Sequence, residues 1–125
     1  MTSPNPKCDR HAAPAAGLAG LDAYRVGLQF YRLLMTALRG KANSHVTAQL
    51  TKAAESVVLN VAEAHPALGA DRARRFRIAA DEASECGAAL DLLEIRGVLS
   101  GQRLRELRGL LDRERAMLWR LSHPK

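Results

Sequence analysis

Hydrophobic residues recur at alternating steps of three and four positions along four segments of the chain, the spacing that places side chains on one face of an α-helix. The first segment begins near Leu21, and it ends at Gly40, a residue type that commonly ends helices. Its apolar positions are Leu21, Tyr24, Leu28, Tyr31, Met35 and Leu38. The pattern therefore predicts a first helix between Leu21 and Gly40.

Three further segments have the same period and their own start and stop signals. The signals are, in chain order, Asn43 or Ser44 and Pro66 for the second, Asp71 and Gly97 for the third, and Ser100 and Pro124 for the fourth. The apolar positions of the second are Val46, Leu50, Ala53, Val57, Val61 and Ala64. No segment alternates with a period of two, so strands are not expected.

Four helices joined by short loops pack most simply as an antiparallel up-down-up-down bundle. The residues before the first predicted helix contain three prolines and two glycines and have no sustained hydrophobic period, a composition typical of a flexible arm. We therefore predict an all-α protein with a flexible N-terminal arm at residues 1–20 and a four-helix bundle domain at residues 21–122.

The first predicted helix has a second apolar face, nearly opposite to the first. A bundle helix needs only one buried face, so a second one suggests another partner surface. We predict that this face forms an oligomer interface through Val26, Phe30, Leu33 and Leu34. The alternative is a first helix that is buried on both sides.

Charge bears on the class of partner. The chain of 125 residues has 19 Lys and Arg against 13 Asp and Glu, a formal net charge of +6. Such a basic protein is a candidate for binding nucleic acid or another polyanion. No apolar run approaches the roughly 18 residues that a membrane span needs, so we expect a cytoplasmic protein with no membrane partner.

The sequence lacks the residue patterns of common catalytic and cofactor sites. No Glu-x-x-His pair of a di-iron bundle is present, and the four histidines are scattered without metal-ligand spacing. There is no phosphate-binding glycine loop and no nucleophile elbow. We therefore expect no metal site, no cofactor, no small-molecule substrate and no enzymatic activity.

Arginines gather at two places that an antiparallel bundle brings to the same end: the start of the third helix and the end of the fourth. The residues are Arg72, Arg74, Arg75 and Arg77, and Arg113, Arg115 and Arg120. Positive charge is disfavoured at a helix N-terminus, so the first group needs a compensating anion. Phosphates of a nucleic acid could supply it, and so could carboxylates of another helix or subunit.

A strip of polar side chains lies beside the apolar face of the second helix. Its members are Gln49, Ser56, Asn60 and Glu63. We interpret them as structural or inter-subunit hydrogen-bonding groups, with ligand binding as the alternative.

Residues 49–64, with the sequence QLTKAAESVVLNVAEA, resemble the Q-L-x-x-A-A-x-S-I-x-x-N-I-A-E-G signature of the proteins encoded by 23S rRNA intervening sequences. Phe76-Arg77-Ile78-Ala79, followed by Glu85 and Leu90, is similar to the third helix of that family, and Leu21-Asp22-Ala23-Tyr24 to its opening. The resemblance implies a left-handed bundle, assembly as a homo-pentamer and no enzymatic activity. It also implies a distant likeness to accessory proteins of diversity-generating retroelements, which bind nucleic acid through a basic surface.

These observations lead to two hypotheses. The first is a non-enzymatic oligomeric bundle that binds RNA or DNA through surface arginines, by phosphate contacts without base-specific readout. Aromatic stacking should contribute little, because most of the few aromatic residues lie on helical seams. The second is a protein-interaction scaffold whose arginines contact sister subunits or a partner protein.

Overall fold

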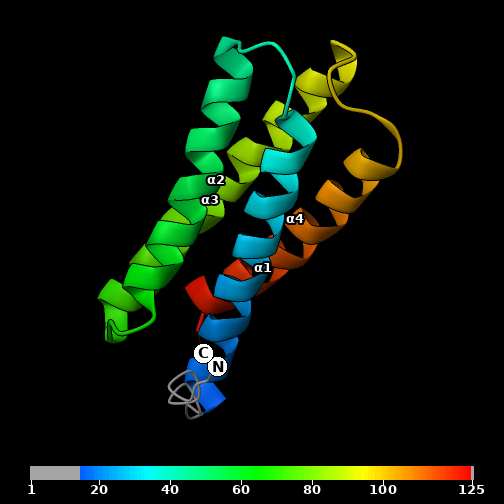
Figure 1. The fold of residues 1–125 in the computed structure, drawn as a ribbon. Coiled ribbons are helices and arrows are strands. Elements are labelled where there is room, and N and C mark those ends of the chain that lie inside the picture. The colour runs from blue at the N-terminus through cyan, green and yellow to red at the C-terminus, as the bar shows by residue number, and fades with distance from the viewer. Residues whose placement is uncertain (1–14, 125) are drawn as a thin grey trace, which may run out of the picture.

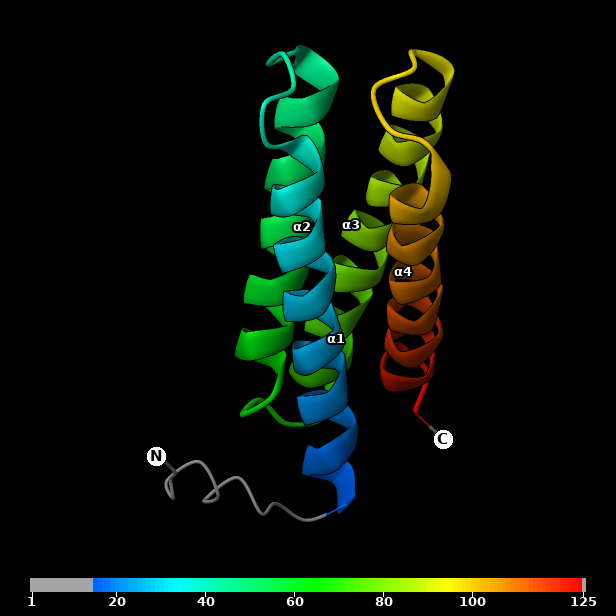
Figure 2. The same ribbon diagram turned by 45° about the vertical axis from the view of Figure 1, so that its right-hand side comes forward.

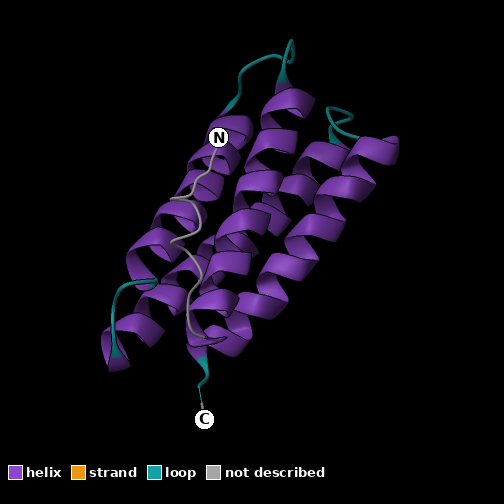
Figure 3. Ribbon diagram, turned by 60° about the horizontal axis from the view of Figure 1, so that its bottom comes forward, coloured by secondary structure: helices purple, strands orange, loops and turns teal. Residues whose placement is uncertain are grey.

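The structure is a computed structural model that describes residues 15–124. These residues form four helices: α1 (Ala15–Leu38), α2 (His45–Ala64), α3 (Gly69–Ile95) and α4 (Gly101–Ser122). No strand occurs between residues 15 and 124, and Figure 3 shows helices joined by loops over the same range. The predicted all-α class is confirmed.

Each helix packs against two others. α1 lies beside α2 and α4, and α3 also lies beside α2 and α4, whereas the backbones of the diagonal pairs stay apart. In Figure 1 the chain runs upward in α1 and α3 and downward in α2 and α4. Figure 2 shows that the end of α4 lies at the same end of the bundle as the start of α1. The left-handed twist stays a prediction.

Helix starts follow local chemistry, with two departures from prediction. Of the two expected candidates, Asn43 and Ser44, it is Ser44 that caps α2. Its hydroxyl accepts a hydrogen bond from the Thr47 backbone N–H, and the Thr47 hydroxyl accepts one from the Ser44 N–H. The predicted cap of α3 is wrong: the helix begins at Gly69, and Asp71 lies in its first turn. The Asp71 carboxylate is engaged instead by two arginines of the same helix.

The N-terminal boundary is also corrected. α1 begins at Ala15, so residues 15–20 of the predicted arm are helical, while residues 1–14 lie outside the described part of the chain. The segment AAGLAG is rich in alanine, which has the highest helix propensity. Gly20 is buried, and a Cβ added to it would lie 3.0 Å from Nδ1 of His65. The N-terminal part of α1, at Gly20, therefore lies beside the C-terminal end of α2.

The predicted core of α2 is confirmed. Leu50, Ala53, Val57, Val61 and Ala64 are all buried. They pack with the buried positions of α3 and α4, which include Phe76, Leu90, Leu93, Leu107 and Leu118. The apolar periodicity identified the inner face here because most positions on the opposite face of α2 are polar or small, among them Lys52, Glu55 and Glu63.

The orientation of α1 is the reverse of the predicted one. Val26, Phe30 and Leu34 are each at most 4% exposed and lie inside the bundle of a single chain. The assignment of these three side chains to an oligomer interface is therefore wrong, since they are not accessible to a second copy. Leu33 is partly buried against the same core. The outer part of α1 carries Tyr24 and Tyr31, which are only partly buried.

Candidate functional site

Three of the seven predicted arginines are engaged within the chain. The Arg72 guanidinium donates to the carbonyl oxygens of Ala64 and His65, at 3.2 and 2.9 Å, and it lies over the Phe76 ring. These carbonyls close α2, where the helix dipole is negative. The end of α2 thus compensates a positive charge at the start of α3.

Arg74 and Arg75 have carboxylate partners. Arg74 Nη2 lies 2.8 Å from Asp71 Oδ1, and Arg75 Nε lies 3.3 Å from Asp71 Oδ2. Arg75 also bonds Glu63 of α2. Hydrogen bonds from Arg74 and Arg75 hold the pKa of Asp71 below its usual range. The negative charge at this helix start is therefore supplied by the protein itself. Glu63 comes from another helix, as one of the two sequence interpretations allowed, whereas Asp71 belongs to α3 itself.

The other four arginines differ. Arg77, Arg113, Arg115 and Arg120 are all exposed. Within residues 15–124, none of the four has a carboxylate at ion-pair distance. On α4, Arg108 by contrast pairs with Asp91 and Glu94 of α3, at 2.7 and 2.6 Å. Four free guanidinium groups are thus available to an external anion.

A shallow hollow of about 320 Å³ lies between α3 and α4, close to these arginines. We call it the α3–α4 hollow; its lining residues are Ala80, Ser84, Asp112, Arg115, Ala116 and Trp119. Arg77 lies one helical turn before Ala80, and Arg120 directly follows Trp119. One unpaired arginine, Arg115, therefore lines the hollow, and two others lie within a helical turn of its lining residues.

Trp119 in this hollow was not predicted as a functional residue. It is 61% exposed, although it is the largest apolar side chain of α4. The sequence signal was available: the buried residues of α4 follow the spacing Leu104, Leu107, Leu111, Glu114 and Leu118, and Trp119 falls outside it. Trp119 is thus an exception to the expectation that most aromatic residues lie on helical seams.

The polar strip of α2 makes contacts within the chain. The Asn60 amide donates to the backbone oxygen and the hydroxyl of Ser56, at 2.9 and 3.1 Å. Glu63 bonds Arg75 of α3, as described above. Gln49 is exposed. Ser56, Asn60 and Glu63 thus act in local and inter-helix bonding.

Glu114 is a second residue that sequence reasoning missed. It is 1% exposed, and neither carboxyl oxygen has a hydrogen-bond partner among the described residues. Burial raises its pKa to about 8, so the group is largely uncharged at neutral pH. Its signal was the seven-residue gap between Leu111 and Leu118, where the helical period expects a core residue.

An apolar surface lies between α1 and α2. Its residues line two hollows and are Leu28, Tyr31, Glu55, Val58 and Leu59, and Gly20, Leu21, Tyr24, Val61, Ala62 and His65. We call this surface the α1–α2 face. Leu59 is 61% exposed, and the Tyr31 hydroxyl donates to Glu55 at 2.8 Å. On α1, this face is the outer surface of the helix. The predicted oligomer interface was on its inner surface.

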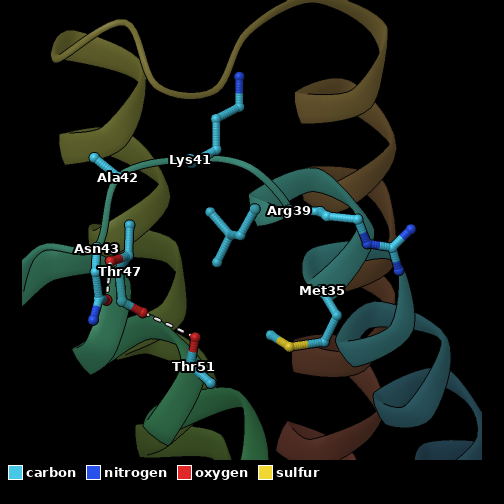
Figure 4. Close-up of a pocket in the computed structure, with 8 residues that line it drawn as sticks. Met35, Arg39, Lys41, Ala42, Asn43, Thr47 and Thr51 are labelled. Carbon is cyan, nitrogen blue, oxygen red and sulfur yellow. Dashed lines mark hydrogen bonds between the residues drawn. The ribbon is translucent and has the colours of Figure 1, made fainter.

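A further hollow, of about 390 Å³, lies at the loop between α1 and α2. Figure 4 shows that Met35 lies along it and that the Arg39 side chain extends away from it. The polar side chains at its edge serve the helix start: Thr47 bonds Asn43, and the Thr51 hydroxyl donates to the Thr47 carbonyl at 2.9 Å. The hollow thus presents no convergent set of free polar groups.

The described residues offer no metal centre and no membrane span. Between residues 15 and 124, no three His, Cys, Asp or Glu side chains gather closely enough to hold a metal ion. None of the four helices is long and apolar enough to cross a membrane.

Comparison with known proteins identifies the family. The family model of the 23S rRNA-intervening sequence proteins matches residues 21–120. Among solved structures, a protein of unknown function of the S23 ribosomal protein family from Bacteroides thetaiotaomicron has a similar fold, with a TM-score of 0.75 at 17% identity. The match covers 88% of this chain and 99% of that one. No match was found among curated proteins. The chain belongs to the family of 23S rRNA-intervening sequence proteins.

Proposed function

We propose that this protein is a non-enzymatic, oligomeric four-helix bundle that binds RNA or other nucleic acid through exposed arginines. Contacts are made to phosphates, without base-specific readout, because guanidinium groups on a helix surface pair with the backbone of any sequence. The observation that carries the proposal is the difference between the arginines. Arg115 lines the α3–α4 hollow, and Arg77 and Arg120 lie within one helical turn of lining residues. None of the three has a carboxylate partner among the described residues, whereas Arg74, Arg75 and Arg108 have them.

The proposed oligomer uses the α1–α2 face. Leucine and tyrosine side chains along this face are partly or largely exposed in one chain. Exposed apolar side chains of this kind on a charged protein are typical of an interface. We expect copies of this chain to cover it, with five copies as the number that the family resemblance implies.

A second candidate is a protein-interaction scaffold, which the same apolar face favours. In that case the arginines around the α3–α4 hollow bind carboxylates of sister subunits or of a partner protein. The nucleic-acid-binding protein and the scaffold differ in the expected effect of replacing these arginines. Nucleic-acid binding requires them only for the ligand, whereas the scaffold requires them for assembly.

The test replaces Arg77, Arg115 and Arg120 together by glutamate. A matched control replaces Arg39, Arg96 and Arg103, which are also exposed, by glutamate. Both variants therefore have the same net charge. Fluorescence anisotropy measures binding to labelled structured RNA and duplex DNA across a salt series from about 50 to 150 mM. We expect the first variant to bind at least tenfold more weakly and the control to lose much less, because charge reversal at a contact costs more than a change in net charge.

Light scattering completes the test. Under the proposal, the first variant keeps the oligomeric state of the unaltered protein. Disassembly of this variant would favour the scaffold instead. Equal weakening by the two variants, or no binding by the folded unaltered protein, would contradict the assignment of these arginines to nucleic acid.

A further inference from the structure

Trp119 has an unusual position for a tryptophan. It is the single tryptophan of the chain, it lies in the last turn of α4, and 61% of it is exposed. A buried position would satisfy so large an apolar side chain better. The described residues leave most of this ring uncovered.

The ring is nevertheless held in place. The imidazole of His123 stacks on the indole with a centroid distance of 4.3 Å and an interplanar angle of 16°. His123 is itself tied to the helix, because its Nδ1 lies 2.8 Å from the Trp119 carbonyl oxygen. One face of the indole therefore has a partner, and its orientation is set before any ligand arrives.

The surroundings of the ring combine small, apolar and cationic groups. Ala80 and Ala116 keep the α3–α4 hollow open beside the indole, and Arg115 lines it from the preceding turn of α4. The Arg115 guanidinium reaches across to α3, where it would lie 3.8 Å from a Cβ added to Gly87. The cationic side chain of Arg115 thus lines the same hollow as the flat indole ring of Trp119.

We propose that Trp119 is a stacking platform for an unpaired nucleobase of single-stranded RNA, with Arg115 binding the adjacent phosphate. A base has a flat π-face of the kind that stacks on tryptophan, and stacking of this kind tolerates every base. Asp112 also lines the hollow, and its carboxylate repels a phosphate from the interior. The base therefore enters the hollow, while the backbone stays near the arginines at its edge.

This inference rests on the proposed function and makes it more specific. Phosphate contacts alone do not distinguish a duplex from a single strand, whereas stacking on Trp119 requires a base that is free of its partner. We therefore expect single-stranded RNA, or unpaired loops of structured RNA, to bind more tightly than duplex RNA at the same salt concentration.

Intrinsic fluorescence tests the inference directly, because Trp119 is the only tryptophan. The full-length protein is titrated with oligouridylate of roughly 12 nucleotides, a length that a single-strand site can cover, and with an abasic strand of the same length. We expect saturable quenching by oligouridylate and little quenching by the abasic strand. Trp119→Ala should weaken anisotropy-detected binding of oligouridylate about tenfold, and Trp119→Phe should keep most of the affinity.

Salt dependence separates the two roles. Trp119→Ala should leave the slope of log affinity against log salt unchanged, since no phosphate contact is lost. Arg115→Gln should weaken binding and reduce the slope by about one. Circular dichroism checks that the variants are folded, as expected for substitutions at exposed positions.

Three results would overturn the inference. The first is saturated binding with unchanged Trp119 fluorescence, and the second is equal quenching by the abasic strand; in both cases the proposed function still holds. The third is dissociation of the oligomer by Trp119→Ala, which would place the residue in a subunit interface. Failure of every strand to bind would instead refute the proposed function itself.

Discussion

Gly27 of α1 leaves the space that the carboxyl group of Glu114 occupies from α4. A Cβ added to Gly27 would lie 3.0 Å from Glu114 Oε2 and 3.4 Å from a methyl group of Val58. The glycine thus permits a close approach of α1 to a buried acid. The core contains a titratable group without a hydrogen-bond partner among the described residues, and this arrangement has consequences for stability.

Glu114 should make stability fall as pH rises. Burial raises its pKa from 4.5 to about 8, so the unfolded chain loses this proton near pH 4.5 while the folded chain retains it to about pH 8. The loss of folding stability caused by Glu114 is absent below pH 4.5, grows between pH 4.5 and about pH 8, and is complete above about pH 8. From about pH 5 to pH 8 it amounts to roughly 3–4 kcal/mol.

Substitution isolates this effect. Glu114→Leu continues the leucine pattern of α4, so the variant should gain stability over the unaltered protein as pH rises, and the difference should be largest above pH 8. Urea unfolding of both proteins at about pH 5 and pH 8 measures it. A constant difference between the two proteins across this range would show that Glu114 titrates normally in the folded state.

Gly27→Ala tests the close approach in α1. Replacement of glycine by alanine inside a helix usually stabilises by about 0.5–1 kcal/mol. At Gly27 the new methyl group meets Glu114 and Val58, so we expect no gain or a loss. The matched control is Gly109→Ala in α4, where a Cβ would meet nothing within 4 Å, and thermal unfolding should show the usual gain there.

A coupling measurement completes this comparison. In a Glu114→Ala background the obstacle is removed, and Gly27→Ala should then stabilise as Gly109→Ala does. An equal gain from Gly27→Ala in both backgrounds would contradict the contact.

Leu59→Glu tests the α1–α2 face as the subunit interface. Leu59 is 61% exposed on that face, and a buried carboxylate without a partner would oppose assembly. We expect a smaller species by light scattering, with helical content retained in circular dichroism. The control is Leu92→Glu, at a leucine of α3 that is 50% exposed and lies away from the face. Dissociation by the control alone would move the interface to α3.

Cys86 should be unreactive in the folded protein. It is fully buried in α3, and burial, with Glu82 and Glu85 adding to it, raises the pKa of its thiol to about 12. The thiolate is the reactive form, so a Cys8→Ser variant should show no reaction with a disulfide reagent at about pH 8. Denaturant should expose one thiol per chain. Rapid reaction in native buffer would show that α3 opens locally.

The arginines show where a local pattern stops being informative. Asp71 lies three and four residues before Arg74 and Arg75, so these ion pairs follow from helix geometry alone. Glu63 lies on another helix, and its bond to Arg75 required the packing of α2 on α3. Arg77 and Arg115 look alike in the sequence to the paired arginines, and only the fold shows that no carboxylate of the described residues reaches them.

The sequence by itself determined the four helices between residues 15 and 124, the start of α2 to within one residue and the inner face of α2, because these depend on spacing and on contacts between near neighbours. The tertiary structure decided which face of α1 is buried. Both faces of α1 are apolar, so the periodicity of the sequence does not distinguish the buried face from the exposed one. It also decided that Glu114 is enclosed opposite Gly27 and that Trp119 lies beside the unpaired Arg115. Each of these depends on residues far apart in the chain, and their distances are fixed only when the helices pack.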